Sequence, residues 1–256
     1  MTDVTELSEE RIAEYLFELA EEDYGAVGRS LPIVDTSANT KKAAASLKKS
    51  GIETVIRYYA RDPAASWKTL SRSEAESLID EKIDLAIVHE NDAKRSSFSY
   101  ASGSLDAEYV CKYGFKTIGQ PEGSAVYFAV DFDYLPSSSI LKKRILPYFQ
   151  GVRDGMKAQG SPYIVGVYGS GFTCQTLLDH SLVDLTWLAQ STGWTGYKQF
   201  KASKRWLCSS TPRPPSARFP WTTTSRIRAF PISAASTSSM RCACARRRTN
   251  PMIGSS

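Results

Sequence analysis

The sequence predicts an α/β protein, a (β/α)8 TIM-type barrel, on three observations. Short apolar runs alternate with helical patterns of about 10–15 residues, which is typical of right-handed βαβ crossovers and a parallel sheet. The glycine-rich loops that bind nucleotides in doubly wound sheets, GxGxxG and GxxxxGK[ST], do not follow the first apolar run. Polar residues end the apolar runs, as they do at the catalytic face of a barrel.

Six strands and the helices between them can be assigned in order from Leu31. The strands are expected at residues 31–37, 53–60, 83–91, 124–133, 163–170 and 185–191. The helices are expected at residues 40–51, 70–82, 104–114, 137–160 and 171–180. Gly51 closes the first helix, and Ser71 or Ser73 caps the second. Six such strands are three-quarters of an eight-stranded barrel.

The fourth strand is the most informative segment, because its apolar run ends in two carboxylates. Asp131 and Asp133 are two positions apart, so on a strand they point the same way and leave its C-terminal end together. Two like charges held close raise the pKa of one of them, which keeps a proton available for general-acid chemistry. The alternative is a helix cap or a loop pair, since Asp133 directly precedes a predicted helix.

Polar residues at the other strand ends are expected to meet these aspartates in one pocket. They are Asp35, Arg57 with Tyr58, Glu90, Tyr168 and Gln190. Glu90 is either a second acid or the start of a loop. Arg57 either binds substrate or pairs with Asp35 inside the barrel. Trp187 either stacks on a sugar, together with Trp194, or packs in the interior.

Composition excludes several classes of protein and site. His89 and His180 lack metal-ligand spacing, so we expect no metal and no cofactor. The five cysteines are scattered, which argues against a disulfide framework. The sequence has no apolar run of 18 residues, so no membrane span is expected. Residues 1–28 are expected to form an acidic helical extension. They lack the features of a signal peptide, which predicts a cytoplasmic protein by default.

The pattern of residues 29–206, the expected barrel, changes in residues 207–256. This segment contains eight arginines and no acid, and it accounts for the net charge of +5. The rest of the chain is mildly acidic, so nucleic-acid binding is not expected. The segment is either a basic disordered tail that binds acidic partners or out-of-frame coding sequence, because a shifted reading of Trp221 and Thr222 yields an aspartate. We expect the last two barrel strands to be missing or disrupted.

Six motifs, in order, resemble one known family. They are VDTS, VIRYY, AIVHEN, GSAVYFAVDFD, VGVYGSG and TWLAQS, between Leu31 and Trp206. The family is the glycoside-hydrolase-like TIM barrel called domain of unknown function 1906, a relative of the family 25 lysozymes. The resemblance gives Asp35 the role of the first-strand aspartate, and Asp131 with Asp133 that of an Asp-x-Glu motif. Asp133 stands where the lysozymes carry Glu, and the shorter side chain would place a proton differently.

The function implied is cleavage or binding of a cell-wall-type polysaccharide such as peptidoglycan. Asp133 is expected to be the general acid, with Asp131 and Asp35 as electrostatic or base partners. Arg57, Tyr58, Glu90, Tyr168, Gln190 and Trp187 are the expected substrate contacts. The alternatives are a catalytically inactive carbohydrate-binding barrel, or a frameshifted product without a function. The sequence does not predict the oligomeric state.

Overall fold

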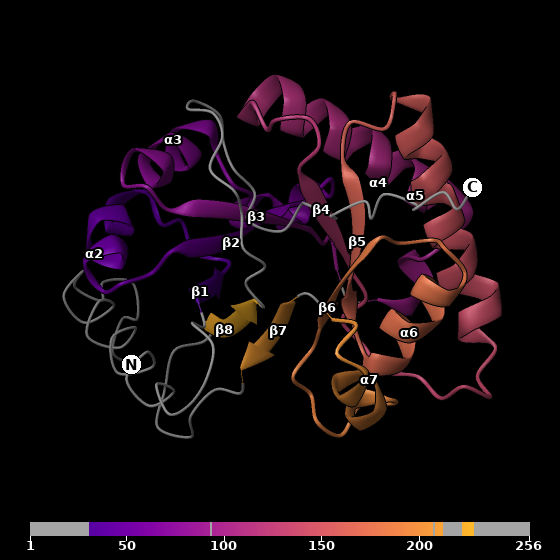
Figure 1. Cartoon of the computed structure of the whole chain (residues 1–256). Helices are drawn as coiled ribbons and strands as arrows, with labels where there is room; N and C mark the ends of the chain where they lie inside the picture. Colours follow the sequence, from indigo (N-terminus) through magenta and orange to yellow (C-terminus); the bar gives the residue numbers. More distant parts are fainter. Residues whose placement is uncertain (1–30, 93, 207, 212–221, 228–256) are drawn as a thin grey trace, which may run out of the picture.

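The computed structural model describes residues 31–92, 94–206, 208–211 and 222–227, and within them the chain folds as an α/β barrel (Figure 1). The strands are β1 (Leu31–Thr36), β2 (Thr54–Tyr59), β3 (Asp84–His89), β4 (Ala125–Ala129), β5 (Ile164–Gly169), β6 (Leu185–Leu188), β7 (Cys208–Thr211) and β8 (Thr222–Ile227). The α-helices are α2 (Ala44–Lys49), α3 (Arg72–Asp80), α4 (Tyr100–Lys112), α5 (Leu146–Ala158), α6 (Gly171–Asp179) and α7 (Tyr197–Ser203). Short 3-10 or π segments are η1 (Lys41–Ala43), η2 (Pro63–Lys68), η3 (Arg95–Ser97), η4 (Tyr113–Ile118) and η5 (Leu141–Ile145). The helix expected within the N-terminal extension lies outside the described residues.

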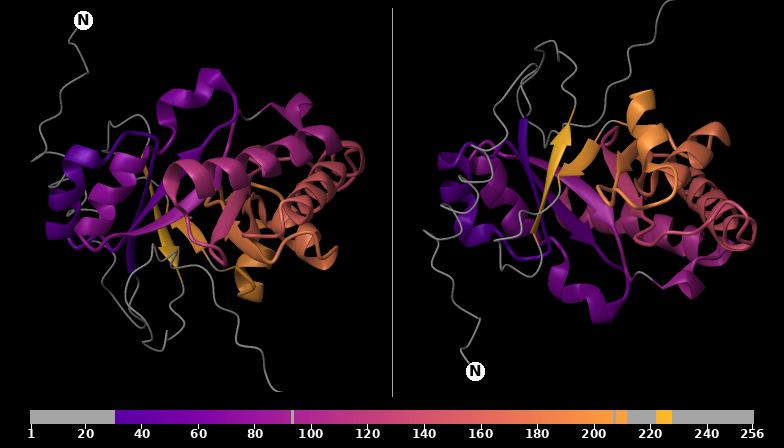
Figure 2. Two further views of the ribbon diagram at one scale, coloured as in Figure 1. Left: turned by 90° about the horizontal axis from the view of Figure 1, so that it is seen from above. Right: turned by 90° about the horizontal axis from the view of Figure 1, so that it is seen from below.

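The first six strands are parallel and each pairs with its neighbour in the chain, which confirms the predicted parallel α/β arrangement. They curl into a half-barrel with the helices on its outer side (Figure 2). β7 continues this order parallel to β6, and the circle closes through β8. β8 is antiparallel to both β7 and β1, so the described strands are not the all-parallel set of a (β/α)8 barrel.

Two strands, β7 and β8, lie within residues 207–256, where the last two barrel strands were expected to be missing or disrupted. Both take part in the backbone ladder, and β8 pairs with β1 over six residue pairs. Backbone pairing needs no particular side chain, which is why the absence of an apolar pattern did not exclude these strands. The reversal of direction at β8 nevertheless falls in the segment where the sequence pattern changes.

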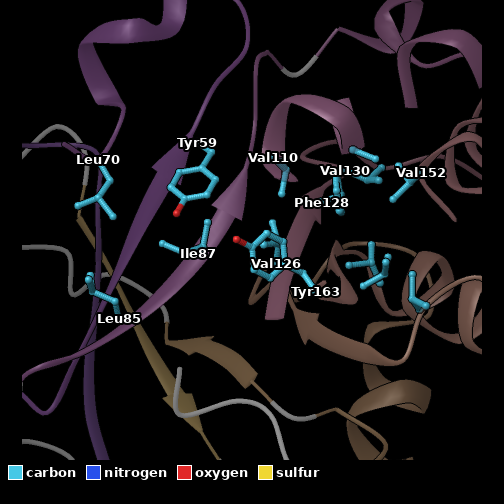
Figure 3. Close-up of a cluster of buried hydrophobic side chains, with 14 of the residues drawn as sticks. Tyr59, Leu70, Leu85, Ile87, Val110, Val126, Phe128, Val130, Val152 and Tyr163 are labelled. Carbon is cyan, nitrogen blue, oxygen red and sulfur yellow. The ribbon is translucent and has the colours of Figure 1, made fainter. Parts of the chain in front are cut away.

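Alternation along each strand divides the apolar side chains into two layers. The larger layer lies between the strands and the helices and includes Val126, Phe128 and Val152 (Figure 3). The smaller layer fills the barrel interior and includes Ile56 and Tyr127. Because successive residues of a strand face opposite sides, the interior layer determines which polar residues reach the open end of the barrel.

Helices α4 and α5 are in close contact because each has a glycine at their crossing. A Cβ on Gly103 would lie 2.0 Å from the carbonyl oxygen of Tyr148, and one on Gly151 would lie 2.0 Å from that of Tyr100. Any side chain at either position would therefore push the helices apart. The close approach lets the Tyr148 hydroxyl donate a hydrogen bond to Asp106 of α4 at 2.9 Å.

Candidate active site at the barrel mouth

Five polar side chains follow the interior face of the strands to their C-terminal ends. We call this group the barrel mouth; its members are Asp35, Tyr58, Glu90, Asp131 and Tyr168. Each continues the alternation of an interior residue two positions earlier, as Asp35 follows Ile33 and Tyr58 follows Ile56. The carboxyl groups of Asp35, Glu90 and Asp131 act electrostatically on one another and on the two tyrosines. The structure therefore brings these sequence-predicted residues together.

Asp35 is the buried carboxyl group of the mouth. Its side chain accepts a hydrogen bond from the Tyr58 hydroxyl at 3.2 Å, through Oδ2. Its Oδ1 is buried and has no hydrogen-bond partner among the described residues. Burial raises the pKa of Asp35 to about 7; the bond from Tyr58 opposes this shift, and the charge of Glu90 adds to it. Asp35 can therefore hold or release a proton near neutral pH, as a general acid or base must.

Glu90 and Asp131 supply the other two carboxyl groups. Burial, with the nearby Glu90 charge, raises the pKa of Asp131 above its ordinary value, and the Lys68 ammonium opposes the change. Lys68 Nζ lies 3.1 Å from Glu90 Oε1 and 4.9 Å from the centre of the Tyr58 ring. Sequence reasoning missed Lys68, which lies in η2 between β2 and α3, in a segment with no apolar pattern to show its direction.

Asp133, the expected general acid, is engaged in a loop contact. Its carboxylate accepts hydrogen bonds from the backbone nitrogen and the hydroxyl of Thr195, at 3.1 and 3.0 Å. Its carbonyl oxygen accepts one from Arg95 Nη2 at 2.9 Å. Asp133 therefore ties the segment after β4 to the loop before α7 and to η3. This placement matches the loop alternative that the sequence left open.

Arg57 lies on the outer side of the barrel wall, and its predicted contact with substrate needs correction. The side chain is fully buried and forms an ion pair with Glu74 of α3, with Nε 2.7 Å from Oε1. It also donates to the carbonyl oxygen of Thr36 at 2.6 Å. The alternative pairing with Asp35 inside the barrel is also wrong, because Arg57 and Tyr58 face opposite sides of β2.

Trp187 packs inside the barrel, and Gln190 contacts helix α7. Trp187 is 2% exposed and packs edge-on against Tyr168, with ring centroids 4.7 Å apart, and against Tyr127 at 6.1 Å. This is the interior packing that the sequence left open against sugar stacking. Gln190 accepts a hydrogen bond from the Tyr197 hydroxyl of α7.

A cavity of about 240 Å³ adjoins the mouth, and we call it the side pocket. Its walls are Arg61, Asp62, Pro63, His89, Glu90, Asn91, Asp92, Ser97, Phe98, Asp106, Ala129 and Tyr148. At its base Asp106 accepts hydrogen bonds from Arg61 Nε at 2.8 Å, Asn91 Nδ2 at 3.1 Å and the Tyr148 hydroxyl. Burial would raise the pKa of Asp106, but its bonds with His89 and Arg61 outweigh that effect and lower it to about 2.

A family comparison decides what this barrel is related to. The family model described as Rv2525c-like, glycoside hydrolase-like domain matches residues 45–241. The chain belongs to this family. The match confirms the glycoside-hydrolase-like relationship expected from the six motifs. It also runs past residue 206, so it includes both β7 and β8.

Three proteins are similar to this chain, one in sequence and two in structure. The chain is 27% identical over 194 residues to the uncharacterized protein YbfG of Bacillus subtilis (strain 168). The matched region covers 71% of the chain and 26% of YbfG, so the chain spans about a quarter of that relative. The crystal structure of the Mycobacterium tuberculosis Tat-secreted protein Rv2525c in complex with L-tartrate superposes with a TM-score of 0.62 at 17% identity, covering 78% of this chain and 96% of Rv2525c. An uncharacterized B. stearothermophilus protein gives 0.54 at 14% identity, covering 77% and 95%. The two structures show a shared fold.

Two further findings concern the described part of this family member. Its histidines, cysteines and acids form no group of three that could hold a metal ion. Among the same residues, no helix is long and apolar enough to cross a membrane.

Proposed function

We propose that this protein binds and cleaves a cell-wall-type polysaccharide at the barrel mouth, with peptidoglycan as the favoured substrate. The observation that carries the proposal is Asp35, a buried carboxyl group whose pKa is raised to about 7 beside two other carboxyl groups. Glycosidases use such a pair, one carboxyl protonated and the other ionised. Membership of a glycoside-hydrolase-like family supports the choice of a glycan as the substrate.

The proposed reaction assigns the proton to Asp35 rather than to Asp133. Asp35 donates its proton to the oxygen of the glycosidic bond as the bond to the anomeric carbon breaks. An ionised carboxylate, Glu90 or Asp131, stabilises the positive charge that develops on the sugar ring. A water molecule then adds its hydroxide to the anomeric carbon, and its proton passes to a carboxylate of the mouth. Tyr58 orients Asp35 through its hydrogen bond, and Tyr168 borders the bound sugar.

The test is release of new reducing ends from purified peptidoglycan by the full-length chain. We expect activity from the wild type, loss of about 10²-fold or more in Asp35→Asn, and a smaller loss in the matched variant Asp133→Asn. The reason is that an asparagine at position 35 cannot supply a proton, whereas an asparagine at position 133 can still accept hydrogen bonds from Thr195. Activity that survives in Asp35→Asn but is lost in Asp133→Asn would return the acid role to Asp133.

A second candidate function is a carbohydrate-binding barrel without catalysis. The observation in its favour is that Thr195 engages the Asp133 carboxylate, at the position where the related lysozymes are expected to carry the catalytic Glu. In this case peptidoglycan binds and no reducing ends appear, in the wild type or in any variant of the mouth.

The hypothesis that residues 207–256 are out of frame stays part of the proposal. A restored frame would supply two parallel strands and complete a regular (β/α)8 barrel, in place of the antiparallel β8. Resequencing the gene across the codons for Trp206 to Thr223 tests this directly. An unchanged sequence there, read from several independent isolates, would reject the frameshift.

A further inference from the structure

The side pocket and the barrel mouth share part of their walls. Glu90 and Ala129 both line the side pocket. Ala129 belongs to the interior layer of the barrel, and the charge of Glu90 acts on Asp35 and Asp131 of the mouth. A ligand that fills the side pocket would therefore lie directly beside the carboxyl groups assigned to the reaction.

The polar base of the side pocket is held in place before any ligand arrives. Asp106 is 3% exposed and receives side-chain hydrogen bonds from Arg61, Asn91 and Tyr148, and His89 Nε2 lies 3.3 Å from its Oδ1. Asn91 Oδ1 in turn accepts hydrogen bonds from the backbone nitrogens of Arg61 and Asp62, at 2.7 and 2.9 Å. A site whose side chains are already fixed loses less entropy when it binds a ligand.

The charged side chains on the pocket walls indicate the chemistry of that ligand. Arg61 binds Asp106 through Nε only, so its terminal nitrogens remain as donors with no hydrogen-bond partner among the described residues. Three further carboxylates line the pocket, those of Asp62, Glu90 and Asp92. Glu90 is paired with Lys68, and Asp92 lies 3.7 Å from the largely exposed Lys94. Several carboxylate acceptors beside the Arg61 donors suit hydroxyl groups, and the excess negative charge disfavours an acidic ligand.

We propose that the side pocket is a subsite for one uncharged sugar ring of the glycan, next to the ring that the mouth carboxyl groups attack. The inference rests on the proposed function. It adds the position of a neighbouring sugar ring and a preference for an uncharged ring. A volume of about 240 Å³ lies below the range of roughly 300–1,000 Å³ that drug-sized ligands occupy, so it suits a single ring. Phe98 and Tyr148 give this ring an aromatic wall.

The test is calorimetric binding of two trisaccharides to the full-length chain. The probes are chitotriose, which is uncharged, and trigalacturonate, which carries three carboxylates. Ser97→Trp fills the pocket from its exposed rim, and Ser96→Trp places the same side chain on the neighbouring residue of η3, which does not line the pocket. We expect chitotriose to bind the wild type and Ser96→Trp equally, and Ser97→Trp at least about tenfold more weakly. We expect trigalacturonate to bind the wild type at least about tenfold more weakly than chitotriose.

Three results would overturn the subsite: no chitotriose binding by the wild type, equal binding by Ser97→Trp and Ser96→Trp, or trigalacturonate binding as tight as that of chitotriose. Thermal melting establishes that both variants are folded, and Ser97→Tyr replaces Ser97→Trp if that variant is not.

The Asp35→Asn variant separates the subsite hypothesis from the hydrolysis hypothesis. If the wild type shows no turnover but Ser97→Trp still weakens binding, the subsite stands and hydrolysis is wrong. If Asp35→Asn abolishes turnover while Ser97→Trp binds normally, hydrolysis stands and the subsite is wrong.

Discussion

Arg57 and Tyr58 are consecutive residues of β2, and their side chains lie on opposite sides of the barrel wall. Arg57 forms a buried ion pair with Glu74 of α3, and the Tyr58 hydroxyl donates to Asp35 at the mouth. One residue thus fixes a helix to the outside of the barrel while the next orients the proposed acid on the inside. A register shift of one position would exchange the two tasks, so the alternation of this strand is essential to both.

Removing one partner of the ion pair on the outer side should be strongly destabilising. Glu74 is fully buried and accepts hydrogen bonds from Arg57 and from the backbone nitrogen and hydroxyl of Thr40, at 2.7 and 2.8 Å. Glu74→Ala leaves the Arg57 charge buried and unpaired, which should lower the free energy of unfolding by about 3–5 kcal/mol.

Urea denaturation measures this loss, and the same helix offers a matched control. Glu76 pairs with Arg72 at 3.0 Å, and both side chains are more than half exposed. Glu76→Ala should therefore cost less than about 1 kcal/mol. Equal small losses in Glu74→Ala and Glu76→Ala would show that the buried pair contributes little.

The raised pKa of Asp35 should make the stability of the fold depend on pH. The folded state, with a pKa of about 7, holds this proton more tightly than the unfolded state, whose pKa is near 3.8. The contribution of Asp35 is therefore most favourable below about pH 4 and is lost as the pH rises to about 7, by up to roughly 4 kcal/mol. Asp35→Asn should be more stable than the wild type at pH 8, and the difference should shrink at pH 5. Denaturation at both values measures it, and a difference that does not change with pH would contradict the assignment.

Much of the mouth was predictable because it depends on a period of two. The apolar runs located six strands, and the polar residues at the ends of these runs identified Asp35 and Tyr58 as candidates for the mouth. Partners across elements were not predictable in the same way. The pairing of Arg57 with Glu74 depends on how α3 packs against β2, and a single sequence does not contain that contact.

Other features of the site could not be predicted, for related reasons. Asp133 continues the alternation of β4 in the sequence, but the strand ends at Ala129, and its carboxylate is engaged by Thr195. The side pocket joins Arg61, His89 and Asp106 from three segments, and Arg61 and Asp106 lie outside every motif that the sequence showed. Its one signal was the AIVHEN motif, in which Glu90 and Asn91 both line the pocket.

Truncation tests the contribution of the last two strands. A chain that ends at residue 227 keeps the pairing of β8 with β1 and of β7 with β6, and one that ends at residue 206 loses both. Exposed strand edges favour aggregation. We therefore expect the shorter chain to have a lower Tm and to be less soluble. Equal Tm values would show that β7 and β8 add no stability and would favour the out-of-frame hypothesis.

The central claim is that Asp35 holds a proton near neutral pH inside the barrel mouth. Carbon-13 NMR titration of its side-chain carboxyl, assigned by the signal that disappears in Asp35→Asn, measures this most directly. We expect a midpoint at about pH 7 and a shift to higher pH in Tyr58→Phe, since the bond from Tyr58 favours the charged carboxylate and lowers the pKa of Asp35. A midpoint near the ordinary value of 3.8, unchanged in Tyr58→Phe, would contradict the claim and remove Asp35 as the proton donor.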